Sequence, residues 1–154
     1  MFQIIEGDLF DSTETYLCHQ TNCVTKRAAH LAAAVFDKYP YADIYSPRKG
    51  MDKPGTIVIK GDNVTQRYVI NMLGQFYPGF PNYPTGKLDG HASRLKYFCA
   101  CLKEMTNLKG SFAFPYTMGC GAAGGDWERY LAGLKWFESQ INGDVIIYKL
   151  PGAK

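Results

Sequence analysis

The fold is decided by residues 111–137, which read SFAFPYTMGCGAAGGDWERYLAGLKWF. The apolar segment 111–115 predicts a short β-strand, and the glycine-rich turn 119–125 follows it. Asp126 is then a natural N-cap for an amphipathic helix that extends to about Phe137. A strand, a glycine-rich turn and a helix in this order are typical of α/β proteins, which bind ligands where the carboxyl ends of strands meet helices.

The turn itself predicts an anion site. Four of its seven residues are glycine, and successive N–H groups at a helix start suit a phosphate. The alternative interpretation is a tight strand-to-helix connection with close packing. No Gly-Lys-Ser/Thr follows, so this is not a Walker loop, and a dinucleotide fingerprint would belong on the first strand.

The rest of the chain alternates between strand and helix patterns. Strands are predicted at 2–6, 16–20, 55–60, 67–73 and 144–148, helices at 28–39 and 89–105, and a hairpin turn at 61–63. Residues 41–54 read as a surface excursion, and 76–90 as a long loop of the kind that covers a site. The pattern predicts an α/β protein with a mixed, largely parallel sheet covered by helices on both faces, in a single domain over 1–154.

Composition excludes several classes of protein. The chain is 46% apolar and has 22 aromatic residues, which excludes a disordered chain, and no apolar run approaches the ~20 residues of a membrane span. The N-terminus lacks the basic region of a signal peptide, so we expect a cytoplasmic or nuclear protein. The net charge of +3 argues against nucleic acid as a partner and favours a small anionic ligand.

The cysteines are predicted to be free thiols. They are Cys18, Cys23, Cys99, Cys101 and Cys120. Their odd number, without a signal peptide, indicates a reducing compartment. Neither Cys18-His19 with Cys23 nor Cys99 with Cys101 has the paired spacing of a zinc site, so no metal site and no cofactor are predicted.

A second signal is His19-Gln20-Thr21-Asn22-Cys23, at the end of the second predicted strand. His19 and Asn22 there would supply a proton donor and a polar clamp at the ligand edge of the sheet. The alternative is a turn asparagine and a hydrogen-bonded histidine. A thiol nucleophile at Cys23 or Cys120 would require His19 or His30 as its base, and nothing in the spacing fixes those distances.

Aromatic residues gather in the long loop. Phe76, Tyr77, Phe80 and Tyr83 would either stack on a base or fill the space beneath the loop.

Four motifs together resemble one family. They are IIEGDL at 4–9, HQTNC at 19–23, NMLGQ at 71–75 and MGCGAAGGDW at 118–127, with Tyr39-Pro40 closing the helix after the second. In this order they resemble macro domains, in the branch that includes ADP-ribose 1''-phosphate phosphatases and ADP-ribose glycohydrolases. The resemblance covers most of the chain.

The resemblance implies a three-layer α/β/α sandwich that binds ADP-ribose at the carboxyl edge of its sheet. Asp8 would accept a hydrogen bond from the adenine amino group, Asn22 would hold the terminal ribose, and the amides of 119–125 would bind the diphosphate. The implied ligand-binding residues are Asp8, Leu9, Cys23, Ala28, Ala29, His30, Gln75, Phe76, Gly119, Cys120, Gly121, Ala122, Ala123, Gly124 and Gly125.

Two positions depart from the family pattern. Ala28-Ala29-His30 stands where a run of glycines is usual, so either the loop takes another path or His30 donates to the phosphates. Ala123 stands where hydrolase relatives carry a catalytic acid.

The resulting hypothesis is a macro domain that binds ADP-ribose and hydrolyses its 1''-phosphate or a related adduct. His19 would transfer the proton and Asn22 would position the substrate, while Asp126 is either a third catalytic group or only an N-cap. The alternative is a non-catalytic reader of ADP-ribose or of ADP-ribosylated protein, which Ala123 and the altered first loop favour.

Overall fold

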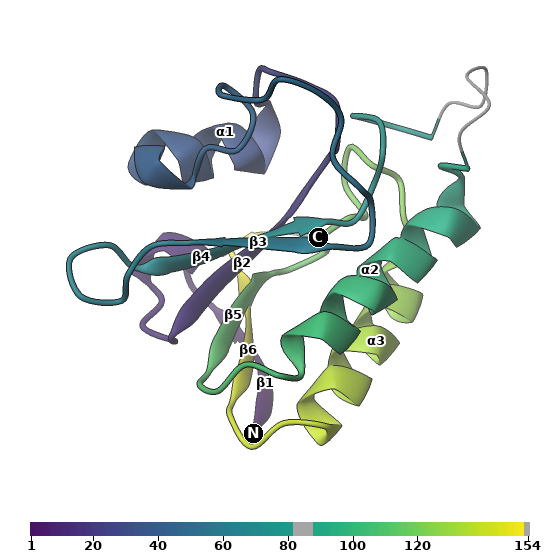
Figure 1. The fold of residues 1–154 in the computed structure, drawn as a ribbon. Coiled ribbons are helices and arrows are strands. Elements are labelled where there is room, and N and C mark those ends of the chain that lie inside the picture. Colours follow the sequence, from purple (N-terminus) through teal and green to yellow (C-terminus); the bar gives the residue numbers. More distant parts are fainter. Residues whose placement is uncertain (82–87, 153–154) are drawn as a thin grey trace.

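The computed structural model describes residues 1–81 and 88–152 (Figure 1). Its strands are β1 (Phe2–Glu6), β2 (Tyr16–Thr21), β3 (Ile57–Lys60), β4 (Tyr68–Leu73), β5 (Phe112–Pro115) and β6 (Val145–Lys149). Its α-helices are α1 (His30–Lys38), α2 (His91–Met105) and α3 (Trp127–Ser139), with short 3₁₀ turns η1 (Leu9–Asp11) and η2 (Pro40–Ala42). No helix within the described ranges is long and apolar enough to cross a membrane.

The six strands form one sheet in the order β1-β6-β5-β2-β4-β3. Every neighbouring pair is parallel except β3 and β4, which are antiparallel and are joined by the predicted hairpin. Gly61 in this hairpin has φ +106°, and a Cβ there would lie 2.3 Å from the carbonyl oxygen of Arg67, so the turn requires glycine. The prediction of a mixed, largely parallel sheet is confirmed.

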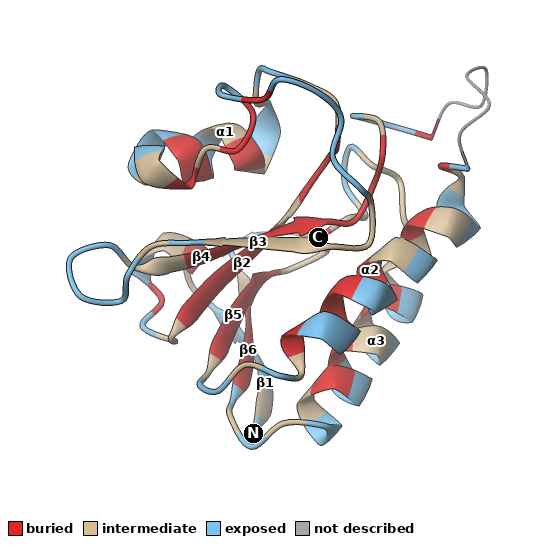
Figure 2. Cartoon of the chain, viewed as in Figure 1, coloured by how far each residue is buried: buried red, intermediate tan, exposed pale blue. Residues whose placement is uncertain are grey.

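Helices cover both faces of the sheet, as predicted. Figure 1 shows α1 on one face and α2 with α3 on the other, and Figure 2 shows buried residues on the helix surfaces that face the sheet. Each face has its own apolar core. The core beneath α2 and α3 includes Phe98, Leu102, Phe112 and Leu134, and the core beneath α1 includes Leu17, Val35, Val69 and Ala113.

The segment 41–54 is only in part the surface excursion that its prolines and charges predicted, since residues 49–53 are exposed. Ile44, Tyr45 and Arg48 are buried, and the ring of Tyr45 meets that of Phe36 edge to face at 5.2 Å. The prediction was wrong for residues 41–45 because this part folds back beneath α1, where its apolar residues complete the second core.

His19 lies in this core and not at the ligand edge of the sheet. It is 0% exposed, and in the register of β2 and β4 it stands opposite Asn71, with its Nε2 2.6 Å from Asn71 Oδ1. The Asn71 amide nitrogen donates to the carbonyls of Ala42 and Val58, so its oxygen is the acceptor and His19 Nε2 carries the hydrogen. The prediction that His19 transfers a proton to a ligand is therefore wrong.

The environment of His19 keeps its imidazole neutral. Burial lowers the pKa of His19 to about 4, against an opposing contribution from the bond to Asn71. His19 Nδ1 is also buried without a partner among the described residues, which suits the unprotonated nitrogen of a neutral ring.

His19 therefore makes stability depend on pH. The unfolded chain protonates this histidine below its ordinary pKa of 6.5 and the folded chain only below about 4, so stability present at pH 7 is lost as the pH falls through this window. The loss attributable to His19 at pH 4 is about 3 kcal/mol. Denaturant melts of the native chain and of His19→Gln, which retains a donor for Asn71, measure it. We expect their difference in unfolding free energy to change by this amount between pH 7 and pH 4, and parallel profiles would contradict it.

Candidate functional site

A crevice of about 320 Å³ opens at the carboxyl ends of β2, β4 and β5, the central parallel strands. It is lined by Gln20, Thr21, Asn22, Thr25, Arg27, Ala29, His30, Leu31, Ala32, Tyr45, Gln75, Pro78, Gly79, Pro115, Tyr116, Thr117, Met118, Gly119, Gly121, Ala122 and Ala123. Eight of the predicted site residues are among them: Asn22, Ala29, His30, Gln75, Gly119, Gly121, Ala122 and Ala123. The location is the usual ligand position of an α/β sheet.

The glycine-rich turn presents unpartnered amides to this crevice. The N–H groups of Cys120, Gly124 and Gly125 bond to carbonyls inside the turn. Those of Gly119 and 121–123 have no partner among the described residues, and these are the four turn residues that line the crevice. The turn thus divides its amides into some that hold its shape and others that are free to bind an anion.

The N-terminus of α1 faces the same crevice. Its N-cap residue, Ala29, makes no side-chain capping bond, and the N–H groups of 30–32 have no partner in the described structure. An uncapped helix N-terminus carries partial positive charge and favours anions. The N-terminus of α3 differs, because the Asp126 side chain accepts a bond from the N–H of Glu128. Amides from α1 and from the turn therefore line one cavity.

Asn22 offers a side-chain donor beside these amides. Its Oδ1 accepts bonds from the N–H groups of Val24 and Thr25 and from the Thr25 hydroxyl, all at 3.0–3.1 Å. These bonds fix the orientation of the amide. The Nδ2 group has no partner among residues 1–81 and 88–152, and it is left to donate into the crevice that Asn22 lines.

Two residues of the segment 41–54 brace the backbone on either side of Asn22. The Tyr45 hydroxyl accepts a bond from the Asn22 N–H at 2.8 Å, and burial raises the pKa of Tyr45 to about 12, so it remains a phenol. Arg48, paired with Asp52, donates to the carbonyls of Asn22 and Thr25 at 2.9 Å. Sequence reasoning missed both. The aromatic residues after Pro40 were a signal that the segment is buried, whereas no local pattern marks Arg48.

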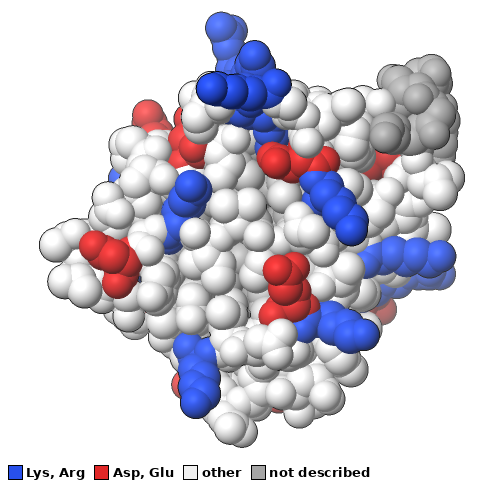
Figure 3. Space-filling model, in the orientation of Figure 1, with Lys and Arg blue, Asp and Glu red and all other residues white. Residues whose placement is uncertain are grey.

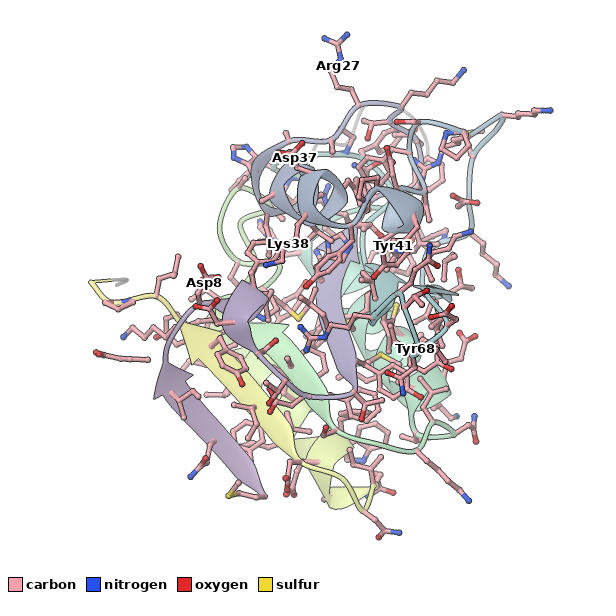
Figure 4. The ribbon with its side chains drawn as sticks, turned by 90° about the vertical axis from the view of Figure 1, so that its left-hand side faces the viewer. Asp8, Arg27, Asp37, Lys38, Tyr41 and Tyr68 are labelled. Atoms are coloured by element: carbon pink, nitrogen blue, oxygen red, sulfur yellow. The ribbon has the colours of Figure 1, made fainter. Side chains whose placement is uncertain are left out.

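The described lining of the crevice carries no acidic side chain. Its lining contains Arg27 and His30 but no Asp, Glu or Lys. Figure 3 shows Lys and Arg side chains at the upper end of this face and at several other places on it, and Figure 4 shows Arg27 projecting outward beyond α1. Free N–H groups without neighbouring carboxylates suit a phosphate-bearing ligand.

Other predicted residues lie outside the crevice: Asp8, Leu9, His19, Cys23, Ala28, Phe76, Cys120, Gly124, Gly125 and Asp126. Asp8 follows β1 at the far edge of the sheet, where its carboxylate accepts a bond from the Phe10 N–H, and Figure 4 shows it well apart from Arg27. Gly124 has φ +76°, and a Cβ there would lie 2.4 Å from the ring of Phe80, so this glycine serves packing. Tyr83 lies outside the described residues, as do the other residues of 82–87.

Two chemical alternatives find no support in the geometry. Asp126 caps α3, pairs with Arg129 and has a 61% exposed side chain, so the structure places it as an N-cap outside the crevice. Burial raises the pKa values of Cys23 and Cys120 to about 12, which disfavours thiolates, and neither lines the crevice. All five cysteines are free thiols, and no cluster of metal-binding side chains occurs among the described residues.

Comparison with known proteins identifies the fold. No family model matches the sequence, and no curated protein sequence matches it. The macrodomain of Mycobacterium tuberculosis DarG is 23% identical with a TM-score of 0.76, over 96% of this chain and 97% of that one. The macrodomain of Thermus aquaticus DarG is 20% identical with a TM-score of 0.72, over 97% and 98%. A Trypanosoma brucei macrodomain crystallised with ADP-ribose is 10% identical with a TM-score of 0.58, over 94% and 62%. The chain has the macrodomain fold.

His30 carries backbone strain at the crevice, since its φ is +55°. This left-handed conformation costs an L-residue roughly 1–2 kcal/mol, and glycine adopts it freely. His30→Gly and His30→Ala both remove the imidazole, but only glycine relieves the strain. We expect His30→Gly to unfold with a free energy about 1 kcal/mol higher than His30→Ala in denaturant melts. Equal stability of the two variants would show that the backbone relaxes to another conformation.

Proposed function

We propose that this chain binds ADP-ribose, or an ADP-ribosyl group, in the crevice between α1 and the glycine-rich turn. The observation that carries the proposal is the convergence of the free amides of Gly119, 121–123 and 30–32 on one cavity without acidic side chains among its lining residues. These donors match the oxygens of a diphosphate. The Trypanosoma brucei macrodomain, a structural neighbour crystallised with ADP-ribose, supports this choice of ligand.

In the proposed complex, the diphosphate lies across the two sets of amides, and Asn22 donates from Nδ2 to the terminal ribose. Asp8 remains the proposed partner of the adenine amino group, as the resemblance to macro domains implies. The backbone amides of the crevice would bind phosphate oxygens and would not recognise a base. Gln75 borders the ribose from the floor of the crevice, which it lines.

Calorimetric titration with ADP-ribose, AMP and ATP tests the proposal. We expect micromolar binding of ADP-ribose and much weaker binding of AMP, since AMP lacks the diphosphate and the terminal ribose. Asn22→Asp is the matched variant: its carboxylate keeps the acceptor that orders 22–25 and replaces the free N–H₂ with negative charge. We expect it to fold normally and to bind ADP-ribose at least about tenfold more weakly. Unchanged affinity would remove Asn22 from the site.

Hydrolysis of the 1''-phosphate or of a related adduct is the second candidate function, and one observation favours it. Of the titratable side chains that line the crevice, Arg27, Tyr45, Tyr116 and His30, only histidine is of a type that exchanges protons near neutral pH. His30 thus replaces His19 and Asp126 as the proposed proton-transfer group. Water would attack the phosphorus and break its bond to the ribose oxygen, which releases phosphate, or attack the acetal carbon and break its bond to the adduct oxygen. His30 would take the proton of the water and return it to the leaving oxygen, while the turn amides hold the diphosphate.

Product formation over time separates the two candidates. If the chain is a hydrolase, His30→Ala should lower turnover of ADP-ribose 1''-phosphate about 100-fold and leave ADP-ribose affinity nearly unchanged. Tight binding without product, for the free ligand and for ADP-ribosylated protein, would identify a reader. Turnover that survives in His30→Ala would exclude His30 from the chemistry.

A further inference from the structure

One buried ion pair touches both walls of the crevice without lining it. Asp89 and Arg94 lie at the start of α2, with Arg94 Nη2 2.8 Å from Asp89 Oδ2, and both side chains are almost fully buried. The first of these walls is the loop after β4, which supplies Pro78 and Gly79, and the second is the adjacent glycine-rich turn.

Asp89 holds the start of the first wall. Its two carboxylate oxygens accept bonds from consecutive backbone N–H groups, Oδ1 from Phe76 at 2.7 Å and Oδ2 from Tyr77 at 2.9 Å. This loop has no strand beside it to pair these groups, so the carboxylate replaces the missing ladder partner.

Arg94 connects the two walls. Its Nη1 donates to the carbonyl oxygen of Gly79 at 2.6 Å and to that of Ala123 at 3.3 Å, and its Nη2 also donates to the carbonyl of Tyr77 at 3.0 Å. Gly79 and Ala123 both line the crevice, and their segments lie side by side, since a Cβ at Gly124 would lie 2.4 Å from the ring of Phe80. One planar guanidinium group therefore fixes the separation between them.

The network continues into the floor of the crevice. The carbonyl of Tyr77 also accepts a bond from Gln75 Nε2, and Gln75 Oε1 accepts one from Gln20 Nε2 on β2. Both glutamines line the crevice. A continuous set of hydrogen bonds thus links the floor, the first wall and the turn through Arg94.

We propose that Arg94 is a positioning residue that holds the loop after β4 and the glycine-rich turn against each other, and thereby places the turn amides and sets the affinity for the diphosphate ligand. This inference rests on the proposed function. The alternative is that Arg94 only stabilises the start of α2. Lysine distinguishes the two roles, because its ammonium group can pair with Asp89 but lacks the planar fork that reaches three carbonyls.

The experiment compares Arg94→Lys with Leu102→Ala, a core variant on the same helix that touches neither wall. Both variants should have a lower Tm than the native chain. For Arg94→Lys we expect ADP-ribose to bind about tenfold more weakly, and amides of 75–81 and of 117–125 to exchange hydrogen faster together. For Leu102→Ala we expect native affinity and native exchange in both segments.

The outcomes are distinguishable. Arg94→Lys with native affinity and native exchange would overturn the proposal, and so would faster exchange in only one wall. If the native chain itself does not bind ADP-ribose, the proposed function fails, and the exchange measurement alone decides whether Arg94 couples the walls. If Arg94→Lys does not fold, Asp89→Asn, of equal size and without the charge, should loosen both segments. Native exchange in that variant would contradict the coupling.

Discussion

The crevice depends on one constraint: irregular backbone at the end of a sheet must find polar partners without a neighbouring strand. The Asp89–Arg94 ion pair supplies these partners for the loop after β4 and the glycine-rich turn, where one carboxylate and one guanidinium bond to five backbone groups. Arg48 does the same at the carbonyls of Asn22 and Thr25. A buried pair of this kind adds little net stability, because desolvation offsets the attraction. Its contribution is to hold loops in one geometry.

The backbone groups that remain without a partner suit the proposed ligand. Once the bracing side chains and the turn have used their share of backbone groups, the N–H groups of Gly119, 121–123 and 30–32 are left without a partner among the described residues. Strained backbone accompanies them, since His30 and Thr117 both have positive φ and both line the crevice. Strain of this kind persists only where surrounding contacts impose it. The walls are therefore organised before a ligand arrives, which lowers the entropic cost of binding.

The sequence predicted the fold well because its signals are local. Strand patterns, the glycine-rich turn, the Asp126 cap and the hairpin at Gly61 each depend on a few neighbouring residues, and they lie where predicted. The site was predicted only in part. Asn22 and the turn follow strands, so their place at the sheet edge could be read directly. Arg48 and Arg94 act across long sequence separations, which no local pattern marks. His19 was placed at the ligand edge because it is polar, whereas it bonds to Asn71 inside the core, and only the register of β2 and β4 reveals this partner.

The two candidate functions would depend on different groups of the crevice: binding on backbone amides and hydrolysis on one side chain. In the proposed complex, fixed amides would bind the diphosphate equally before and during a reaction at the terminal ribose, so they would raise affinity without raising the rate. Catalysis requires a group whose interaction strengthens in the transition state, and in the proposed hydrolysis that group would be His30, the one histidine among the described lining residues. Binding of the diphosphate would therefore depend on many backbone N–H groups, which no single substitution removes. Hydrolysis would rest on one exposed imidazole, so a homologue that lost it would retain the ligand and become a reader.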